Sequence, residues 1–238
     1  MSKDNENVNF YQHPSMKKHI VSYHNPCFSE TQMTIPCRVG IIAPSGAGKS
    51  VALLNYIARC KDTFFHIYLV IKQDEPLYQL LREKVGAKNI TTYTKLTDLP
   101  MPKDLNIGLK QVLMVFDDYV VDKHQEKIEE YFIRGRKVGG GISIFYLSQN
   151  YFSIPPIIRR QFNYLIILKL SGSRDLNLIL RNYSLGVDIK QLTAIYKDAA
   201  KIKFDFLKLD CDNPDENKKF SKNWNSFYKI TNESDDEN

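Results

Sequence analysis

The sequence contains few of the features that would place the chain in an oxidising compartment. It has only four cysteines, Cys27, Cys37, Cys60 and Cys211, among 238 residues. No pair has the short spacing of zinc ligands, and no compact disulfide framework is visible. We therefore expect free thiols and a reducing compartment.

Long hydrophobic runs are also missing. No stretch of about 18 apolar residues occurs, so the sequence predicts no transmembrane helix. The first residues, 1–7, are polar and do not resemble the apolar core of a signal peptide. No internal repeat is visible. We expect a soluble protein that is not secreted and that has no membrane partner.

The overall composition is that of an ordinary globular protein. Hydrophobic residues make up 43% of the chain and charged residues 25%, which is enough for a self-supporting core. The 33 Lys and Arg residues exceed the 27 Asp and Glu residues, giving a formal net charge of +6. This mild excess is compatible with a polyanionic partner such as nucleic acid but does not identify one.

Apolar runs that predict strands alternate with segments of helical periodicity. The expected strands are residues 38–42, 65–71, 89–94, 111–116, 142–147, 164–170 and 200–209, the last resembling an edge strand. The expected helices are residues 50–59, 75–85, 123–133, 175–182 and 189–197. This alternation predicts an α/β fold with a mostly parallel central sheet and helices on both faces.

A phosphate-binding loop is predicted between the first strand and the first helix. Residues 43–50 read Ala-Pro-Ser-Gly-Ala-Gly-Lys-Ser and match G-x-x-x-x-G-K-S, with Ala43 in place of the first glycine. Gly46 and Gly48 would let backbone N–H groups turn toward phosphate oxygens at a helix N-terminus, which favours anions. Lys49 would bind the β- and γ-phosphates, and the Ser50 hydroxyl would bind Mg²⁺.

The pattern therefore predicts an ATP–Mg²⁺ site. A glycine-rich turn that binds no nucleotide is the alternative. The residues expected to contact the nucleotide are Pro44, Ser45, Gly46, Ala47, Gly48, Lys49, Ser50 and Val51.

Polar residues follow the next two buried strands. Asp117, 67 residues after Ser50, is expected on the Mg²⁺ side of the site, and Asp118 is expected to polarise the attacking water. A strand-ending Asp-Asp turn is the alternative. Gln149 ends the strand 32 residues further on, which leaves room for one helical crossover between neighbouring strands. It would orient the water or sense the γ-phosphate, unless it only binds a loop.

Four arginines are candidates for phosphate recognition. Arg134 and Arg136 precede a glycine triplet, and Arg159 and Arg160 follow an Ile-Pro-Pro segment. Each could act as an arginine finger in a neighbouring subunit's site, contact a DNA backbone, or be a solvated surface side chain. The sequence leaves these three readings open.

Four segments, taken in order, carry a more specific signal. They are A-P-S-G-A-G-K-S, V-L-M-V-F-D-D, R-G-R-K-x-G-G-G-I-S-I-F-Y-L-S-Q-N-Y and I-P-P-I-I-R-R. This set resembles the genome-packaging ATPases of poxviruses, giant viruses and virophages, which belong to the FtsK–HerA superfamily of DNA-pumping motors. The resemblance covers roughly residues 36–170, and the small size is most similar to the virophage members. Lys137 stands where the family often has His, and Asp118 where Glu is usual.

The resemblance implies an additional-strand P-loop NTPase that hydrolyses ATP to move double-stranded DNA into a preformed capsid. It also implies double-stranded DNA, capsid proteins and further copies of the chain in a hexameric or pentameric ring as partners. The location would be the virion or a viral factory in the host cytoplasm. The catalytic residues would be Lys49, Asp118, Gln149, Arg159 and Arg160.

Two other functional classes stay open. A nucleotide kinase would need an acceptor pocket and usually an arginine-bearing lid, and no strong lid signature is visible. A non-catalytic P-loop protein would bind nucleotide to control assembly. The sequence predicts three parts. They are an extended N-terminal arm over residues 1–35, a P-loop ATPase domain over 36–209 and a polar, acidic C-terminal tail over 210–238.

Overall fold

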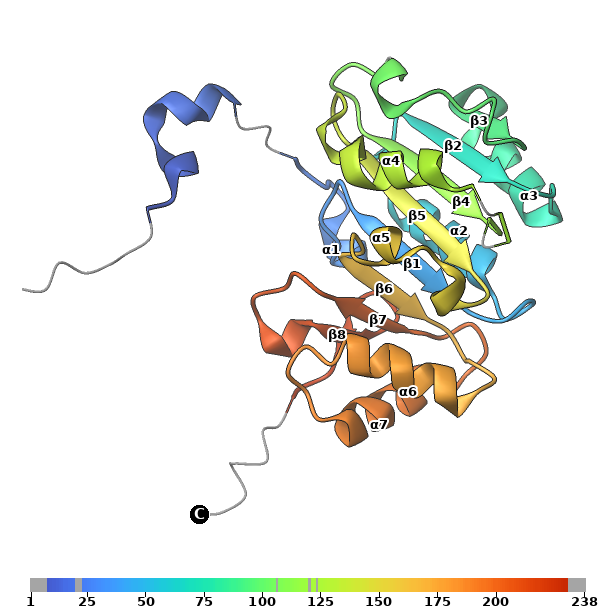
Figure 1. Cartoon of the computed structure of the whole chain (residues 1–238), viewed down its shortest axis with the longest axis vertical. Coiled ribbons are helices and arrows are strands. Elements are labelled where there is room, and N and C mark those ends of the chain that lie inside the picture. The colour runs from blue at the N-terminus through green and yellow to red at the C-terminus, as the bar shows by residue number, and fades with distance from the viewer. Residues whose placement is uncertain (1–7, 20–22, 106, 120, 123, 231–238) are drawn as a thin grey trace, which may run out of the picture.

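One large sheet organises the chain. The computed structural model describes residues 8–19, 23–105, 107–119, 121–122 and 124–230. Within them the sheet has nine strands in the order β3-β2-β4-β5-β1-β6-β7-β8-β9. Helix α4 lies in front of this sheet and α2 behind it in Figure 1. The predicted α/β architecture with helices on both faces is confirmed.

The elements have the following bounds. The strands are β1 Arg38–Ile42, β2 His66–Ile71, β3 Ile90–Tyr93, β4 Val112–Asp117, β5 Ile142–Ser148, β6 Tyr164–Ile167, β7 Leu207–Asp210, β8 Phe220–Lys222 and β9 Ser226–Phe227. The α-helices are α1 Phe28–Thr31, α2 Lys49–Arg59, α3 Pro76–Val85, α4 Glu126–Arg134, α5 Pro156–Arg159, α6 Ser173–Asn182 and α7 Ile189–Ala199. The 3-10 helices are η1 Phe10–Gln12, η2 Pro14–His19, η3 Ala87–Asn89, η4 Pro102–Asp104, η5 Gly135–Lys137, η6 Tyr151–Ser153 and η7 Glu216–Lys218.

The first six strands are parallel, and their order positions the site. Strand β5 pairs with β1 on one side and with β4 on the other. It is therefore the additional strand between the strand that leads to the phosphate loop and the strand that ends in Asp117. In register, Ile42 lies beside Ser148 and Asp117 beside Leu147. The carboxyl ends of β1, β4 and β5 consequently meet at one edge of the sheet.

Two cores, one on each face, hold the helices to the sheet. On β4, Leu113 and Val115 point into the core that packs against α2 and α3, while Met114 and Phe116 point into the core that packs against α4. All four side chains have no exposed surface. Strands buried on both faces read as continuous apolar runs, which is why these strands were predictable from sequence.

The end of the sheet differs from the prediction. The strand expected over residues 200–209 is only β7, and it is not an edge strand because it pairs antiparallel with β6 and with β8. The tail expected from residue 210 continues the sheet through β8 and β9. Phe220 and Trp224 explain this, since both are buried among otherwise polar residues. The acidic residues 231–238 lie outside the described part of the chain.

The N-terminal arm is shorter than expected. Residues 8–19 lie away from the body (Figure 1), and Phe10 and Tyr11 are exposed. By contrast, Met33 and Ile35 are buried in the core that contains α2. Asn25 donates a side-chain hydrogen bond to the Met33 carbonyl at 2.7 Å. The segment before β1 therefore belongs to the folded domain.

The sequence predicted free thiols and no transmembrane helix, and the structure bears on both. All four cysteines are free thiols, and burial raises the pKa of Cys37 to about 11. None of the helices in the described ranges is long and apolar enough to cross a bilayer.

Candidate active site

The loop after β1 has the geometry of a phosphate cradle. Gly46 and Gly48 adopt φ angles of 70° and 107°, in the left-handed region that favours glycine. Helix α2 begins at Lys49, and Gly48 at its N-cap offers no side chain to its first amides. These amides are donors without an intrahelical partner, and the helix dipole adds partial positive charge there. This arrangement suits an anion.

Lys49 lies over the loop. Its ammonium group donates to the carbonyl oxygens of Ala43 at 3.1 Å and Pro44 at 3.4 Å. Burial lowers the pKa of Lys49, and the nearby carboxylates, of which Asp117 has the largest effect, raise it. The side chain is therefore held between the loop and the acidic strand end, where it can exchange carbonyl oxygens for phosphate oxygens.

Asp117 is a buried carboxylate at the end of β4, with 8% of its surface exposed. The Tyr78 hydroxyl, from α3, donates a hydrogen bond to its Oδ2 at 2.6 Å. Burial raises the pKa of Asp117 to about 6, although the Tyr78 hydrogen bond and the charge of Lys49 lower it. At neutral pH the ionised form dominates, as a cation ligand requires.

Glu75 and Tyr78 join the site without having been predicted. The Ser50 hydroxyl donates to Glu75 Oε2 at 3.3 Å. Glu75 follows β2 and precedes Pro76, the first residue of α3. A carboxylate just beyond a buried strand is the same signal that identified Asp117, and here it was interpreted only as the start of a helix. Tyr78 gave no such signal because its partner is 39 residues away.

Asp118 and Gln149 are brought together as predicted for neighbouring strand ends. The Gln149 amide donates to Asp118 Oδ1 at 3.3 Å. Asp118 has a φ of 61°, a left-handed conformation that Asp tolerates better than most residues. Its main-chain N–H reaches the Leu147 carbonyl of β5 at 3.4 Å. The exposed carboxylate is thus fixed between β4 and β5.

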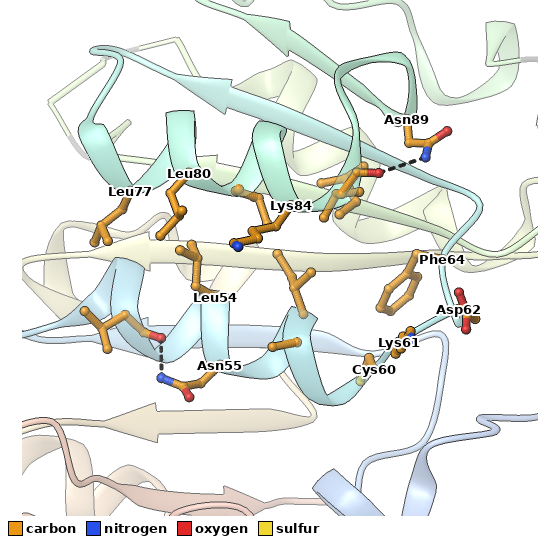
Figure 2. A pocket seen from close by; sticks show the side chains of 16 residues that line it. Leu54, Asn55, Cys60, Lys61, Asp62, Phe64, Leu77, Leu80, Lys84 and Asn89 are labelled. Carbon is orange, nitrogen blue, oxygen red and sulfur yellow. Dashed lines mark hydrogen bonds between the residues drawn. The ribbon is translucent and has the colours of Figure 1, made fainter.

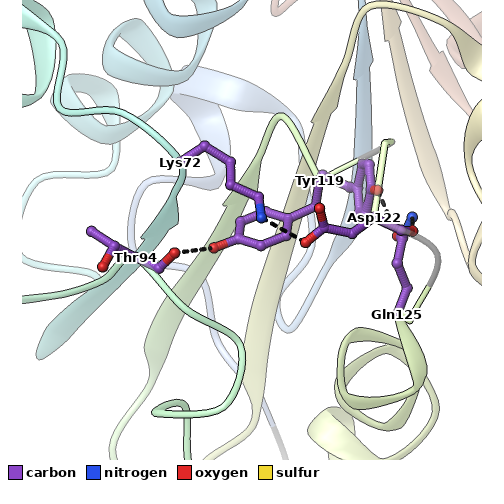
Figure 3. Close-up of polar contacts among 6 residues, drawn as sticks. Lys72, Thr94, Tyr119, Asp122 and Gln125 are labelled. Atoms are coloured by element: carbon purple, nitrogen blue, oxygen red, sulfur yellow. Dashed lines mark hydrogen bonds and ion pairs between the residues drawn. The ribbon is translucent and has the colours of Figure 1, made fainter.

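A network behind Asp118 holds the chain that follows it (Figure 3). Lys72, just beyond β2, forms an ion pair with Asp122 at 2.6 Å, and its ammonium lies 4.5 Å from the centre of the Tyr119 ring. The Tyr119 hydroxyl donates to the Thr94 carbonyl at 3.3 Å. This network ties the segment after the two aspartates to β2 and to the end of β3, which restricts how far Asp118 can move.

The oxygen donors fit a magnesium ion that arrives with its nucleotide. Ser50, Asp117 and Glu75 supply a hydroxyl and two carboxylates. Over the described residues, no three His, Cys, Asp or Glu side chains gather into a site that could hold a metal by themselves. Mg²⁺ is ordinarily bound through one or two carboxylates together with substrate phosphates and waters, so this donor set fits it.

The predicted arginines come before strands, whereas the phosphate loop and Asp118 follow strands. Arg134 ends α4 and pairs with Glu130 at 2.6 Å, and Arg136 lies in η5 ahead of β5. Arg159 and Arg160 come just before β6. Because β1, β5 and β6 are parallel, residues that precede them lie at the amino ends, about 16 Å from the phosphate loop for five residues of strand. By this estimate Arg134 and Arg136, which precede β5, lie away from their own chain's phosphate loop.

Arg159 borders a small pocket between α5 and the segment that follows β5. Its guanidinium carbon lies 5.0 Å from the centre of the Tyr151 ring and 5.5 Å from that of Phe152. Its Nε is buried and has no hydrogen-bond partner in the structure. The pocket of about 380 Å³ is lined by Tyr151, Pro156, Arg159, Arg160, Phe162, Asn182 and Tyr183.

A larger cavity, of about 660 Å³, lies between α2 and α3 and not at the phosphate loop (Figure 2). Leu54 from α2 and Leu77 and Leu80 from α3 contribute to its wall. Val51 also lines it, so the Val51 side chain faces this groove. Any contact of Val51 with a nucleotide would therefore use its main chain.

Comparison with known proteins agrees with this geometry. The family model described as "Poxvirus A32 protein" matches residues 27–204, which include the phosphate loop, both aspartates, Gln149 and all four arginines. The chain belongs to the poxvirus A32 protein family. The predicted resemblance to the poxvirus proteins is thus confirmed. The comparison with curated proteins gave no match.

Solved structures resemble this A32 family member in fold. The genome packaging NTPase B204 of Sulfolobus turreted icosahedral virus 2, in complex with ATP-gammaS, matches with a TM-score of 0.51 at 14% identity, covering 79% of this chain and 97% of that one. B204 of Sulfolobus turreted icosahedral virus, described as a DNA-packaging ATPase, matches with 0.51 at 15%, covering 79% and 97%. EssC (ATPases 2 and 3) from Geobacillus thermodenitrificans matches with 0.52 at 15%, covering 84% and 41%. These similarities establish the P-loop NTPase fold.

Proposed function

We propose that this protein is a viral genome-packaging ATPase, which hydrolyses ATP and uses the energy to move double-stranded DNA into a capsid. One observation carries the proposal: in a chain of the A32 family, one sheet edge gathers a phosphate loop, a buried carboxylate and a second carboxylate paired with Gln149. The B204 proteins, which share the fold, are a genome packaging NTPase and a DNA-packaging ATPase.

The phosphates would be held by the first amides of α2 and by Lys49, which leaves its two carbonyl partners to bind them. Mg²⁺, when bound with ATP, would neutralise charge on the phosphate oxygens. Ser50 and Asp117 would hold it, with Glu75 beside them. Tyr78 would keep Asp117 in place and ionised, because its hydrogen bond lowers the pKa of that carboxyl against the effect of burial.

Asp118 would polarise the attacking water. Water oxygen bonds to the γ-phosphorus, the bond from that phosphorus to the β–γ bridging oxygen breaks, and the water proton passes to a carboxylate or to the phosphate released. Gln149 would orient Asp118 and the water and would sense the loss of the γ-phosphate. Glu75 is the second candidate for the base, since its carboxylate lies 3.3 Å from the Ser50 hydroxyl. Positioning and charge stabilisation would supply most of the rate.

The four arginines, on a surface called here the arginine edge, would act between copies of the chain. Arg134 and Arg136 come before β5, and Arg159 and Arg160 come before β6. A hexameric or pentameric ring would let them reach a neighbour's site or the DNA backbone. DNA binding through phosphate contacts would be independent of sequence and sensitive to salt. The protein would act in the virion or in a viral factory, together with capsid proteins.

The test is phosphate release from ATP with and without double-stranded DNA, at low and moderate salt. We expect DNA to stimulate hydrolysis in the wild type, Lys49→Ala to abolish it, and Lys88→Ala, a change at an exposed lysine in η3, to leave it intact. A rate of hydrolysis that does not change when DNA is added would indicate that the protein acts on a partner other than DNA. ATP binding without hydrolysis would favour the non-catalytic assembly factor, and phosphate appearing on an added nucleoside would favour the kinase.

A further inference from the structure

The positions of the hydrolytic groups fix which way the rest of the nucleotide must point. In phosphoryl transfer the attacking and leaving oxygens lie roughly in line. Asp118 and Gln149 lie at the ends of β4 and β5, on one side of β1. Water activated there attacks from the β5 side, so the leaving diphosphate and its nucleoside extend across β1 toward β6, which pairs with the other side of β1.

An aromatic side chain lies on that side of the loop. Phe204 belongs to the turn that connects α7 with β7. A Cβ atom added to Gly48 would lie 2.5 Å from Phe204 Cδ1 and 3.4 Å from Leu168 Cδ2, so both side chains border the phosphate loop. Leu168, directly after β6, donates its main-chain N–H to the Ile42 carbonyl at 3.1 Å. Phe204 and Leu168 thus form an apolar wall beside the nucleoside end of the loop.

The turn presents the Phe204 ring instead of burying it. The side chain is 45% exposed, and the residue has a φ of 75°, which is unusual for a bulky side chain. Two residues later Phe206 is buried, and its ring lies 4.9 Å from that of Trp224. The Lys203 ammonium lies 5.0 Å from the Phe204 ring centre. The Phe204 ring is therefore partly exposed beside the phosphate loop, where it can serve as a stacking surface.

We infer that Phe204 forms the base subsite of the nucleotide site, with its ring stacked on the purine of ATP and Leu168 completing the apolar wall. The inference rests on the proposed function, because it takes the nucleotide orientation from the hydrolytic groups. Stacking uses the flat face of the base, which all bases share, so recognition here depends on the presence of a base more than on its edge. Stacking on the base would explain why the Phe204 side chain is exposed beside the phosphate loop.

The decisive experiment separates the base from the phosphates. Binding of ATP, ADP and inorganic tripolyphosphate, each with Mg²⁺, is measured by calorimetry for wild type and Phe204→Ala. We expect roughly tenfold weaker ATP and ADP binding in the variant, with tripolyphosphate binding unchanged. Ile202→Ala, which removes an exposed side chain in the same turn, should change neither. Equal loss for ATP and tripolyphosphate, or no loss for ATP, would overturn the base subsite.

A fluorescent variant gives a second measurement that does not depend on the alanine protein folding well. The chain has a single tryptophan, Trp224, which is buried. In Phe204→Trp, ATP should quench the introduced indole by stacking, whereas tripolyphosphate should not. A wild type that binds neither ligand would refute the ATPase itself. A wild type that binds both, with equal quenching by both in the variant, would refute only the base subsite.

Discussion

The amide of Gln149 donates to Asp118 Oδ1 at 3.3 Å, which joins the ends of two adjacent parallel strands. Neither residue makes this contact through the sheet's own hydrogen bonds, because both lie just beyond their strands. A change in one side chain therefore reaches the other directly. The pair connects the Asp118 carboxylate with the segment that follows β5.

Asp118→Asn should lower the rate of hydrolysis about 100-fold or more while leaving ATP binding intact, since a general base contributes this much. Glu75→Gln should have a smaller effect on rate and should raise the Mg²⁺ concentration required, because Glu75 contacts the Ser50 hydroxyl. Single-turnover phosphate release measures the first, and a Mg²⁺ titration the second. If Glu75→Gln abolished turnover and Asp118→Asn did not, Glu75 would be the base.

Hydrolysis should fall as the pH drops through about 6, because protonation of Asp117 removes the charge that holds the cation. In Tyr78→Phe the fall should move to higher pH: the Tyr78 hydrogen bond lowers the pKa of Asp117, so its loss raises that pKa further. The pH profile of kcat/KM checks this. Tyr93→Phe, on the edge strand β3, is the matched control. An unshifted profile in Tyr78→Phe would show that Asp117 does not govern the acidic limb.

Lys208 should make stability rise with pH. Burial lowers the pKa of its ammonium to about 8 from 10.5, although the charge of Asp210 raises it. The ammonium donates to the carbonyls of Thr31 and Trp224. Between about pH 8 and 10.5 the unfolded chain binds more protons than the folded one, so this group's contribution to stability increases there, by on the order of 3 kcal/mol in full. Lys208→Met should remove this contribution, so that stability rises less, or falls more, with pH than in the wild type.

Urea unfolding at several pH values across this window measures the effect on the free energy of unfolding. Lys201→Met, at an exposed position after α7, is the control and should retain the slope. A Lys208→Met protein whose stability rises with pH as steeply as the wild type would place the titrating group elsewhere.

Mixing experiments should reveal whether an arginine acts on a neighbouring copy. Arg159→Ala and Lys49→Ala proteins should each be inactive alone. Their mixture should recover part of the activity, since some interfaces would pair an intact loop with an intact arginine. Arg59→Ala, at the end of α2, is the control and should be active alone. If Arg159→Ala is inactive and mixing restores nothing, the arginine is not supplied between copies.

A role in DNA binding predicts a different result, which can be measured on variants of the other arginines. An arginine that contacts a DNA phosphate should, when replaced by alanine, reduce the salt dependence of DNA binding by about one unit of slope. Arg136→Ala and Arg160→Ala can be compared with Arg59→Ala in this measurement. An unchanged slope would leave those arginines without a DNA contact.

Local patterns were sufficient to predict much of the site. The phosphate loop, Asp117, Asp118 and Gln149 each lie where a buried strand ends, and burial on both faces gave those strands continuous apolar runs. The adjacency of β4 and β5 also followed from the length of their connection. These features depend on residues close together in the sequence, so the fold did not have to be known first.

Features that depend on distant partners could not be predicted in this way. Tyr78 meets Asp117 across 39 residues, and Glu75 meets Ser50 across 25. The proposed role of Phe204 depends on its position against Gly48, which only the structure shows. The end of the sheet was missed because Phe220 and Trp224 are isolated apolar residues in a polar segment, and neither forms a periodic pattern.

The parallel strands give the molecule a polarity with consequences for assembly. The phosphate loop follows β1 and Gln149 follows β5, whereas Arg136 precedes β5 and Arg160 precedes β6. An interface that sets the arginine edge of one copy against the nucleotide edge of the next joins unlike surfaces head to tail. An open chain of copies joined in this way has one free surface of each kind at its two ends, and closing the chain into a ring covers both. Every copy in the ring then has the same orientation relative to the next. The polarity of the sheet in each copy would therefore give the whole ring a direction of rotation.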